Sequence, residues 1–183
     1  GMDSSSKGNI KALGSYEGKV AYCIEPGIGS WTFDELTQKD ENYWDNYPSK
    51  FNKTISPELI KQFIGRVMHY GYVGNVSPAW TSTNSGADHL AEINATQMII
   101  WEIIVGERDE NFNKIDAGDY GKDNVLDLIP SNYPLRSKTM EHYNRIVNAV
   151  KKHVKLPSGF QRSTSTAKTY EMKYDGSAYT VTI

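Results

Sequence analysis

The sequence predicts an α+β fold, in which a sheet formed from N- and C-terminal strands packs against a helical region with a central buried helix. Two observations lead to this expectation. Apolar residues recur at helical spacing through the helical region, about residues 56–154. Near both ends of the chain they alternate instead, which is the period of a β-strand.

The chain is expected to consist of a short start and one domain. Residues 1–14 begin with Gly1-Met2 and a serine-rich stretch, which is typical of a tag or a flexible N-terminus. Residues 15–183 are expected to form one domain, because a chain of 183 residues is long enough for a substantial core. The chain ends at Ile183 inside a strand pattern, so we expect it to be part of a longer protein.

Composition argues against several classes of function. The formal net charge is −2 and lysine and arginine do not cluster, so we expect no binding to nucleic acid or to an anionic membrane surface. No apolar run approaches the roughly 20 residues of a membrane span, so we expect no membrane insertion. Cys23 is the single cysteine, which excludes an internal disulfide and a multi-cysteine zinc site.

Strand patterns occur at both ends of the domain. Residues 16–25 are predicted to form a strand with Tyr22 and Cys23 on opposite faces, ended by a turn at residues 26–27. Residues 30–52 mix aromatic and acidic side chains without a period, so we expect a long loop that covers a cleft. Residues 168–183 alternate around Asp175-Gly176 and predict a β-hairpin.

Two amphipathic helices are predicted on either side of a central one. Ser56 caps the first, and Gly71 or Gly74 ends it. Ser137 opens the other, and residues 156–159 stop it. Their apolar stripes are Leu59, Ile60, Phe63, Ile64 and Val67 in the first helix, and Tyr143, Ile146, Val147, Val150 and Val154 in the second.

The central helix is predicted over residues 88–106, capped by Ser85 or Asp88 and ended by Gly106. Gln97 lies in the middle of its apolar seam. A buried side-chain amide must find partners for its carbonyl and its N–H groups, or it costs about a few kcal/mol. Gln97 is therefore the leading candidate for a functional residue.

The segment from residue 107 to residue 136 is acidic and irregular. The spacing of Asp116 and Asp119 lacks the alternate oxygen ligands of a calcium loop. We therefore expect a solvated surface here, without a metal.

Cys23 is open to three interpretations. It can be a small buried hydrophobic residue. It can pair with a histidine, as in cysteine hydrolases and transglutaminases, but such thiols sit at helix N-termini whereas Cys23 ends a strand. The histidines are His69, His89, His142 and His153. A third possibility is that the thiol attacks the Gln97 carboxamide, expels ammonia and leaves an internal thioester. Spacing alone does not decide between this bond and a core cysteine beside a glutamine that caps backbone carbonyls.

Two motifs resemble those of the thioester domain of Gram-positive bacterial cell-surface adhesins. This family pairs an aromatic-Cys motif with a Thr-Gln-x-Ala-Ile-Trp motif on a helix. Here Tyr22-Cys23-Ile24-Glu25 is followed by Thr96-Gln97-Met98-Ile99-Ile100-Trp101. The resemblance covers most of the chain, and it identifies residues 15–183 as a thioester domain. Ile99 departs from the usual alanine and alters the packing behind the glutamine.

The resemblance implies an intramolecular thioester between Cys23 Sγ and Gln97 Cδ, formed without a cofactor. A lysine amine of a host surface or matrix protein would attack the Gln97 carbonyl, leaving a covalent amide link. This is single-turnover bond formation, so the domain is not expected to be an enzyme. Tyr22, Thr96 and Trp101 are expected to line the thioester pocket, although Tyr22 and Trp101 suit simple core packing equally well.

The family also implies a location. We expect an extracellular, cell-wall-anchored surface protein, with this domain as a monomeric unit of a longer multidomain chain. The alternatives are a non-covalent ligand-binding adhesin module with an inert cysteine, and a Cys-His hydrolase or transglutaminase.

Overall fold

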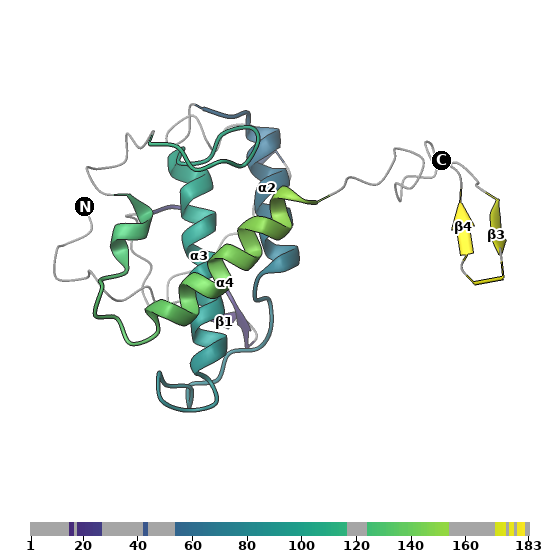
Figure 1. Ribbon diagram of the computed structural model, residues 1–183. Coiled ribbons are helices and arrows are strands. Elements are labelled where there is room, and N and C mark those ends of the chain that lie inside the picture. Colours follow the sequence, from purple (N-terminus) through teal and green to yellow (C-terminus); the bar gives the residue numbers. More distant parts are fainter. Residues whose placement is uncertain are drawn as a thin grey trace. The chain divides into compact units, whose positions relative to one another are not determined.

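The computed structural model describes residues 15–16, 18–26, 42–43, 54–116, 124–153, 171–174, 176–177 and 179–181. The chain divides into two compact units, residues 1–152 and residues 153–183. In its described part the first unit contains the short hairpin β1 (Ser15–Tyr16) and β2 (Lys19–Val20), the helices α2 (Pro57–Tyr70), α3 (Ala87–Val105) and α4 (Arg136–Lys151), and the 3-10 helix η3 (Val125–Leu128) (Figure 1). The second contains β3 (Met172–Tyr174) and β4 (Tyr179–Val181).

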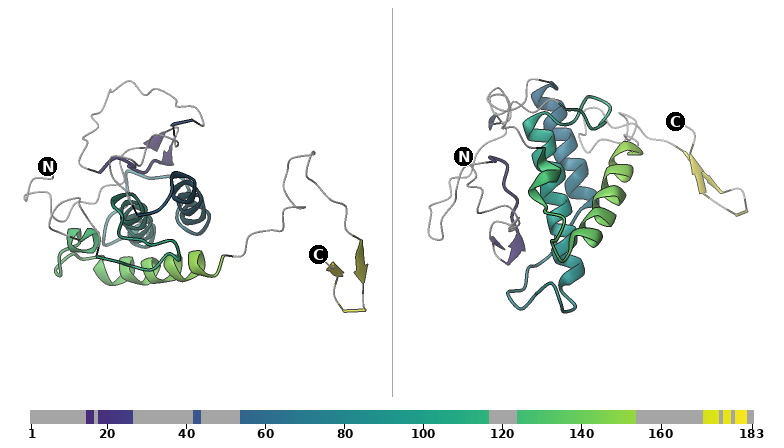
Figure 2. Two further views of the ribbon diagram at one scale, coloured as in Figure 1. Left: turned by 90° about the horizontal axis from the view of Figure 1, so that it is seen from above. Right: turned by 60° about the vertical axis from the view of Figure 1, so that its left-hand side comes forward.

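Helix α3 is the predicted central buried helix. It packs against both α2 and α4, and Figure 2 shows it between the hairpin and the other two helices. From Ile93 to Val105 every residue of α3 is buried. Gly106 ends the helix in the left-handed conformation with φ +86°, as the sequence predicts. None of the helices among the described residues is both long and apolar enough to span a membrane.

The predicted caps of α3 are wrong. Gly86 occupies the cap position, and neither Ser85 nor Asp88 makes a capping hydrogen bond there. The chain is held instead by Asn84, whose Oδ1 accepts the Gly86 N–H at 2.9 Å. A side chain on Gly86 would meet the ring of Trp80, because a Cβ there would lie 2.2 Å from Trp80 Cγ.

Helix α2 follows the prediction closely. The Ser56 hydroxyl caps it by accepting the Leu59 N–H at 3.3 Å, and Gly71 ends it. Four of the five predicted stripe residues are buried, and Leu59 is partly buried against the same core. Gly71 also lets the end of α2 approach α3 closely, because a Cβ there would lie 2.5 Å from Thr96 Oγ1.

Helix α4 differs from the prediction at both ends. It begins at Arg136 without a side-chain cap, so Ser137 lies inside the helix. It ends at Lys151, earlier than the predicted stop at residues 156–159. Its buried face contains Thr139, Tyr143, Ile146 and Val150, with Val147 partly buried and Val154 outside the described residues.

The continuous strand predicted over residues 16–25 is wrong. The segment instead forms the tight antiparallel hairpin β1–β2, with Gly18 at φ +80° between the two strands. The described residues that follow Val20, up to residue 26, belong to no strand. The Val20 N–H donates to the Gly74 carbonyl at 3.1 Å, so the loop after α2 takes up the backbone bonding at this point.

The predicted C-terminal hairpin is present in the second unit. Strands β3 and β4 pair antiparallel, with Tyr174 opposite Tyr179, and Gly176 has φ +103° in the connection. Within the described residues β1 pairs with β2 and β3 with β4, so the expected common sheet from both chain ends is not confirmed. The predicted loop over residues 30–52 lies outside the described residues except for residues 42 and 43.

The acidic segment after α3 forms a surface turn around Asp109, but Glu107 and Arg108 are buried, so the solvated surface expected for the whole segment is only partly present. Asp109 Oδ1 accepts the backbone N–H groups of Asn111 at 2.9 Å and Asn113 at 2.7 Å. Asp116 is exposed, whereas Asp119 lies outside the described residues. The described residues contain no group of three or more His, Cys, Asp and Glu side chains that could hold a metal ion.

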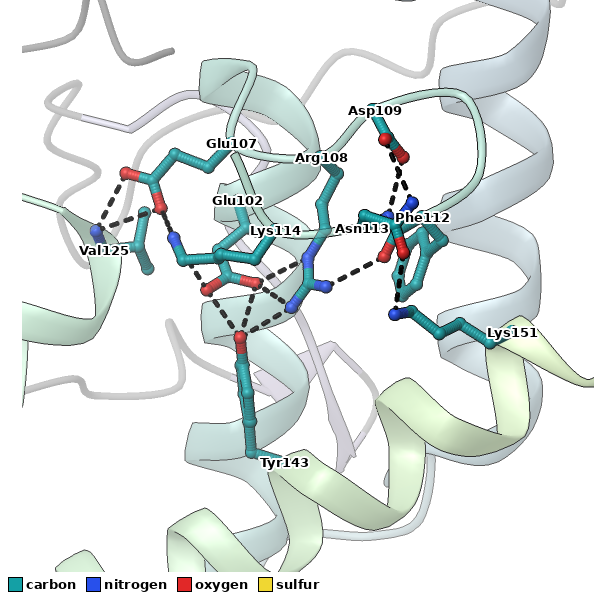
Figure 3. A network of polar contacts seen from close by, with 10 residues as sticks. All are labelled: Glu102, Glu107, Arg108, Asp109, Phe112, Asn113, Lys114, Val125, Tyr143 and Lys151. Carbon is teal, nitrogen blue, oxygen red and sulfur yellow. Dashed lines mark hydrogen bonds and ion pairs between the residues drawn. The ribbon is translucent and has the colours of Figure 1, made fainter. Parts of the chain in front are cut away.

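A buried polar network joins α3 to α4 and to the loop after α3 (Figure 3). Glu102 on α3 is 0% exposed and accepts hydrogen bonds from the Arg108 Nη2 at 2.6 Å and the Tyr143 hydroxyl at 2.8 Å. The Arg108 guanidinium also donates to the Phe112 carbonyl at 3.0 Å. Lys114 forms a further ion pair with Glu102 at 3.2 Å. Burial and the Glu102 carboxylate raise the pKa of Tyr143, so its hydroxyl stays a donor.

Replacing Arg108 with methionine should destabilise the fold by about 3 kcal/mol, because it leaves the buried Glu102 carboxylate without its closest cation. Urea denaturation measures the change in unfolding free energy. The matched control is Arg145→Met, which breaks the partly exposed pair with Glu92 and should cost less than about 1 kcal/mol. Equal costs for the two variants would show that the buried network does not anchor α3.

Candidate functional site

The side chain of Gln97 is bonded to the backbone of Cys23. Gln97 is 0% exposed in the middle of α3, and Cys23 lies in the segment that follows β2. The Cys23 N–H donates to Gln97 Oε1 at 2.8 Å, and Gln97 Nε2 donates to the Cys23 carbonyl at 2.9 Å. The structure therefore brings together the two residues that the sequence singled out, although 74 positions separate them.

This pair of hydrogen bonds also fixes the direction of the Cys23 backbone. It requires the N–H and the C=O of Cys23 to point the same way, as in a strand residue that exchanges both bonds with its neighbour. The Cβ of such a residue stands out of the hydrogen-bonding plane. The side chain of Cys23 therefore leaves the plane of these two hydrogen bonds, beside the Gln97 carboxamide.

The thiol of Cys23 is partly buried in an apolar environment. It packs against the hydrophobic cluster formed by Met98, Trp101, Val105, Val125 and Ile129. Burial raises the pKa of the Cys23 thiol, and the Glu25 carboxylate raises it further, whereas the Glu25 backbone N–H and the Trp101 indole lower it. The thiol is therefore predominantly protonated at neutral pH and differs from the activated thiolates of cysteine hydrolases.

Two of the histidines that could have formed a Cys-His pair are engaged elsewhere. The His89 ring stacks on Trp80 with centroids 4.7 Å apart. His142 Nε2 lies 3.1 Å from Asp88 Oδ1. These contacts give no support to a Cys-His hydrolase.

Tyr22 and Thr96 hold the segment around Cys23 against α3. The Tyr22 hydroxyl donates to the Tyr72 carbonyl at 2.6 Å. The Tyr72 N–H donates in turn to Thr96 Oγ1 at 3.2 Å, and Thr96 Oγ1 donates to the Glu92 carbonyl at 2.8 Å. Burial raises the pKa of Tyr22, so this hydroxyl remains protonated. The residues next to Cys23 and to Gln97 are thus joined through the backbone of Tyr72.

Sequence reasoning did not identify Tyr72 or Gly71 as part of this arrangement. Tyr72 acts through its backbone, which leaves no signature in side-chain chemistry. Gly71 was recognised only as a helix stop, whereas its absent Cβ also makes room for Thr96. Only the packing of α2 against α3 shows either role.

Trp101 and Ile99 lie on different sides of α3. Trp101 belongs to the cluster against which Cys23 packs, and it is 6% exposed. Ile99 belongs to the separate core that α3 shares with α2 and α4. The bulk of Ile99 is therefore accommodated in that core and does not press on the thiol.

Comparison with known proteins shows the family of the chain. The family model described as "TED: Thioester domain" matches residues 20–152, a range that contains both motifs. The chain therefore belongs to the thioester domain family. No curated protein and no solved structure gives a match.

Replacing Thr96 with valine should destabilise the fold by about 1–2 kcal/mol, because the near-isosteric change leaves the Tyr72 N–H without its acceptor. Thermal and urea unfolding measure the effect. The control is Thr139→Val on α4, since the Thr139 hydroxyl is fully buried and has no hydrogen-bond partner among the described residues. That change should be neutral or stabilising. A loss as large as that of Thr96→Val would assign both effects to packing.

Proposed function

We propose that Cys23 Sγ and Gln97 Cδ form an intramolecular thioester that reacts once with a primary amine and thereby fixes the domain covalently to its target. The observation that supports this is that the buried Gln97 carboxamide forms two hydrogen bonds with the backbone of Cys23. Membership of the thioester domain family agrees with it. The domain is a covalent binder and not a turnover enzyme.

In this proposal the bond forms by attack of the Cys23 thiol on the Gln97 carboxamide. The Cys23 sulfur attacks Gln97 Cδ, while the Cys23 N–H at 2.8 Å from Oε1 stabilises the negative charge that develops on this oxygen. The C–N bond then breaks, and Nε2 leaves as ammonia after taking up the thiol proton. The Gln97 carboxamide is already held on the backbone of Cys23, so little further ordering is needed to reach the transition state.

The thioester is the reactive form toward a target. The nitrogen of a primary amine attacks Gln97 Cδ, the C–S bond breaks, and one amine proton ends on the Cys23 sulfur. The product is an amide between the Gln97 side chain and the amine, together with one free thiol. Because the domain remains attached to its product, each molecule reacts a single time.

The biological setting belongs to the same proposal. We infer that the domain is part of a longer, cell-wall-anchored protein on the surface of a Gram-positive bacterium. It would act there as a monomeric adhesin unit, and its target would be a lysine of a host surface or matrix protein. Burial of Gln97 supports such a role, because a thioester exposed to water would be lost to hydrolysis before it met the target.

A purely non-covalent role for the same contact is the principal alternative. Both polar ends of the carboxamide already have partners, so Gln97 could fasten the N-terminal segment without any reaction. Covalent closure of this loop of 74 positions would add about 4 kcal/mol of stability by the chain-entropy relation for cross-links. Whether Cys23 and Gln97 are covalently joined therefore distinguishes the two roles.

Freshly purified protein should have an intact mass lower than its sequence mass by one ammonia. Cys23→Ala and Gln97→Ala should each give the full mass expected for their own sequence, because neither can form the bond. A wild-type protein at full mass, with glutamine at position 97 and a Cys23 thiol that a maleimide labels stoichiometrically, would refute the thioester. Glutamate at position 97 would instead reveal a thioester lost to hydrolysis.

Incubation with methylamine should add this amine at Gln97 and release the Cys23 thiol in equal amounts. Peptide mapping locates the adduct, and thiol titration counts the released sulfur. Gln62 on α2 is an internal control, since it has no thiol partner among the described residues and should remain unmodified. A demonstrated thioester that stays unchanged in methylamine over days would be a structural cross-link, and the adhesin role would fail.

A further inference from the structure

The indole N–H of Trp101 is an unsatisfied donor at the candidate site. Trp101 is 6% exposed, and its Nε1 has no hydrogen-bond partner among the described residues. A buried N–H without an acceptor is unfavourable, and such groups are uncommon in folded proteins. The position of this donor therefore calls for an explanation.

The Cys23 sulfur is a polar atom that packs against the same cluster as this donor. Trp101 lies one helical turn after Gln97 on α3, so the two side chains share a face of the helix. Long helical side chains lean toward the preceding turn, which carries the indole toward Gln97. Gln97 is bonded to the Cys23 backbone, and the Cys23 side chain packs against the cluster that contains Trp101. The indole also favours the thiolate form of Cys23, as a nearby donor does even when its alignment is imperfect.

We propose that Trp101 is a catalytic residue of thioester opening, whose indole N–H donates a hydrogen bond to the Cys23 sulfur as it departs. This inference rests on the proposed function. It assigns to Trp101 a chemical role in addition to the packing of its ring.

The hydrogen bond from Trp101 is stronger in the transition state than in the ground state, because the charge on the Cys23 sulfur changes during the reaction. While the thioester is intact, its sulfur carries little charge and is a weak acceptor. When the amine attacks Gln97 Cδ, the electron pair of the breaking C–S bond passes to Sγ, and the hydrogen bond strengthens because the acceptor becomes anionic. An interaction that is stronger in the transition state than in the ground state raises the rate. The amine proton then neutralises the sulfur.

The backbone cooperates with Trp101 in this role. The Glu25 N–H is a second donor that favours the thiolate, whereas the Glu25 carboxylate opposes it. The Cys23 N–H is bonded to Gln97 Oε1 and is placed to stabilise the charge on the carbonyl oxygen. The two sites of developing charge, oxygen and sulfur, thus each have their own donors. Of the two donors that favour the thiolate, the Trp101 indole belongs to a side chain and can therefore be removed by mutation.

The test compares Trp101→Phe with Trp80→Phe. Both changes remove one indole N–H and keep an aromatic ring, but Trp80 stacks on His89 in a cluster separate from the thiol. In Trp101→Phe we expect the methylamine reaction to slow about tenfold, and the pKa of the released Cys23 thiol to rise by about 1. In Trp80→Phe the rate of the methylamine reaction should stay within about twofold of the wild-type rate. The pKa of the released Cys23 thiol should stay close to the wild-type value. The thiol pKa is read from the pH dependence of alkylation by iodoacetamide.

A role in packing alone would not raise the thiol pKa, because loss of packing exposes the thiol to water and lowers its pKa. If Trp101→Phe forms the thioester and reacts with methylamine at the wild-type rate, with an unchanged thiol pKa, the inference is overturned. If Trp101→Phe does not form the thioester, the same pKa comparison is made in Gln97→Ala with and without Trp101→Phe. An equal pKa in that pair also refutes the donor role. Failure of the wild-type protein to lose ammonia is a different result, which rejects the proposed function itself.

Discussion

The two hydrogen bonds between the Gln97 carboxamide and the Cys23 backbone are the constraint on which the site depends. An amide in the middle of a buried helix must be satisfied, because leaving it without partners costs about a few kcal/mol. Within the described residues its partners come from a segment 74 positions earlier in the chain. The N-terminal segment must therefore cross α3 at Gln97, and Cys23 is brought to the carboxamide by the same requirement that stabilises the fold.

Two polar arrangements support this crossing from different sides of α3. Near its middle, Thr96 links the helix through the Tyr72 backbone to the Tyr22 hydroxyl, beside Cys23. Near its end, Glu102 links the helix to Arg108 and Tyr143. Groups that react with one another gain most from elements whose positions are fixed by packing and hydrogen bonds. Helix α3 meets this condition, because polar contacts anchor it on both sides of Gln97.

The proposed thioester is a bond that is stored and used once, and the electrostatics at Cys23 suit it. A hydrolase needs a persistent thiolate, which a nearby cation or a helix N-terminus supplies. Burial instead raises the pKa of the Cys23 thiol, and the contacts that favour the thiolate are N–H donors without full charge. Such donors act most strongly at the moment when charge develops on sulfur. The environment thus matches bond exchange at the carbonyl better than repeated nucleophilic turnover.

The sequence alone determined the helices and drew attention to Gln97, because a 3.6-residue period and an amide on an apolar seam are local signals. It also indicated the pairing with Cys23, but through the resemblance of two motifs and not through spacing. Tertiary structure alone decided how residues 16–25 are bonded, since the partners of an extended segment are distant: the Gly74 carbonyl for Val20 and the Gln97 side chain for Cys23. It likewise decided the partners of Glu102, which the sequence shows only as a charged exception in an apolar run. Arg108 and Tyr143 reach Glu102 because a loop and a neighbouring helix pack there, and hydrogen bonds from a loop or from another helix leave no periodic trace in the sequence.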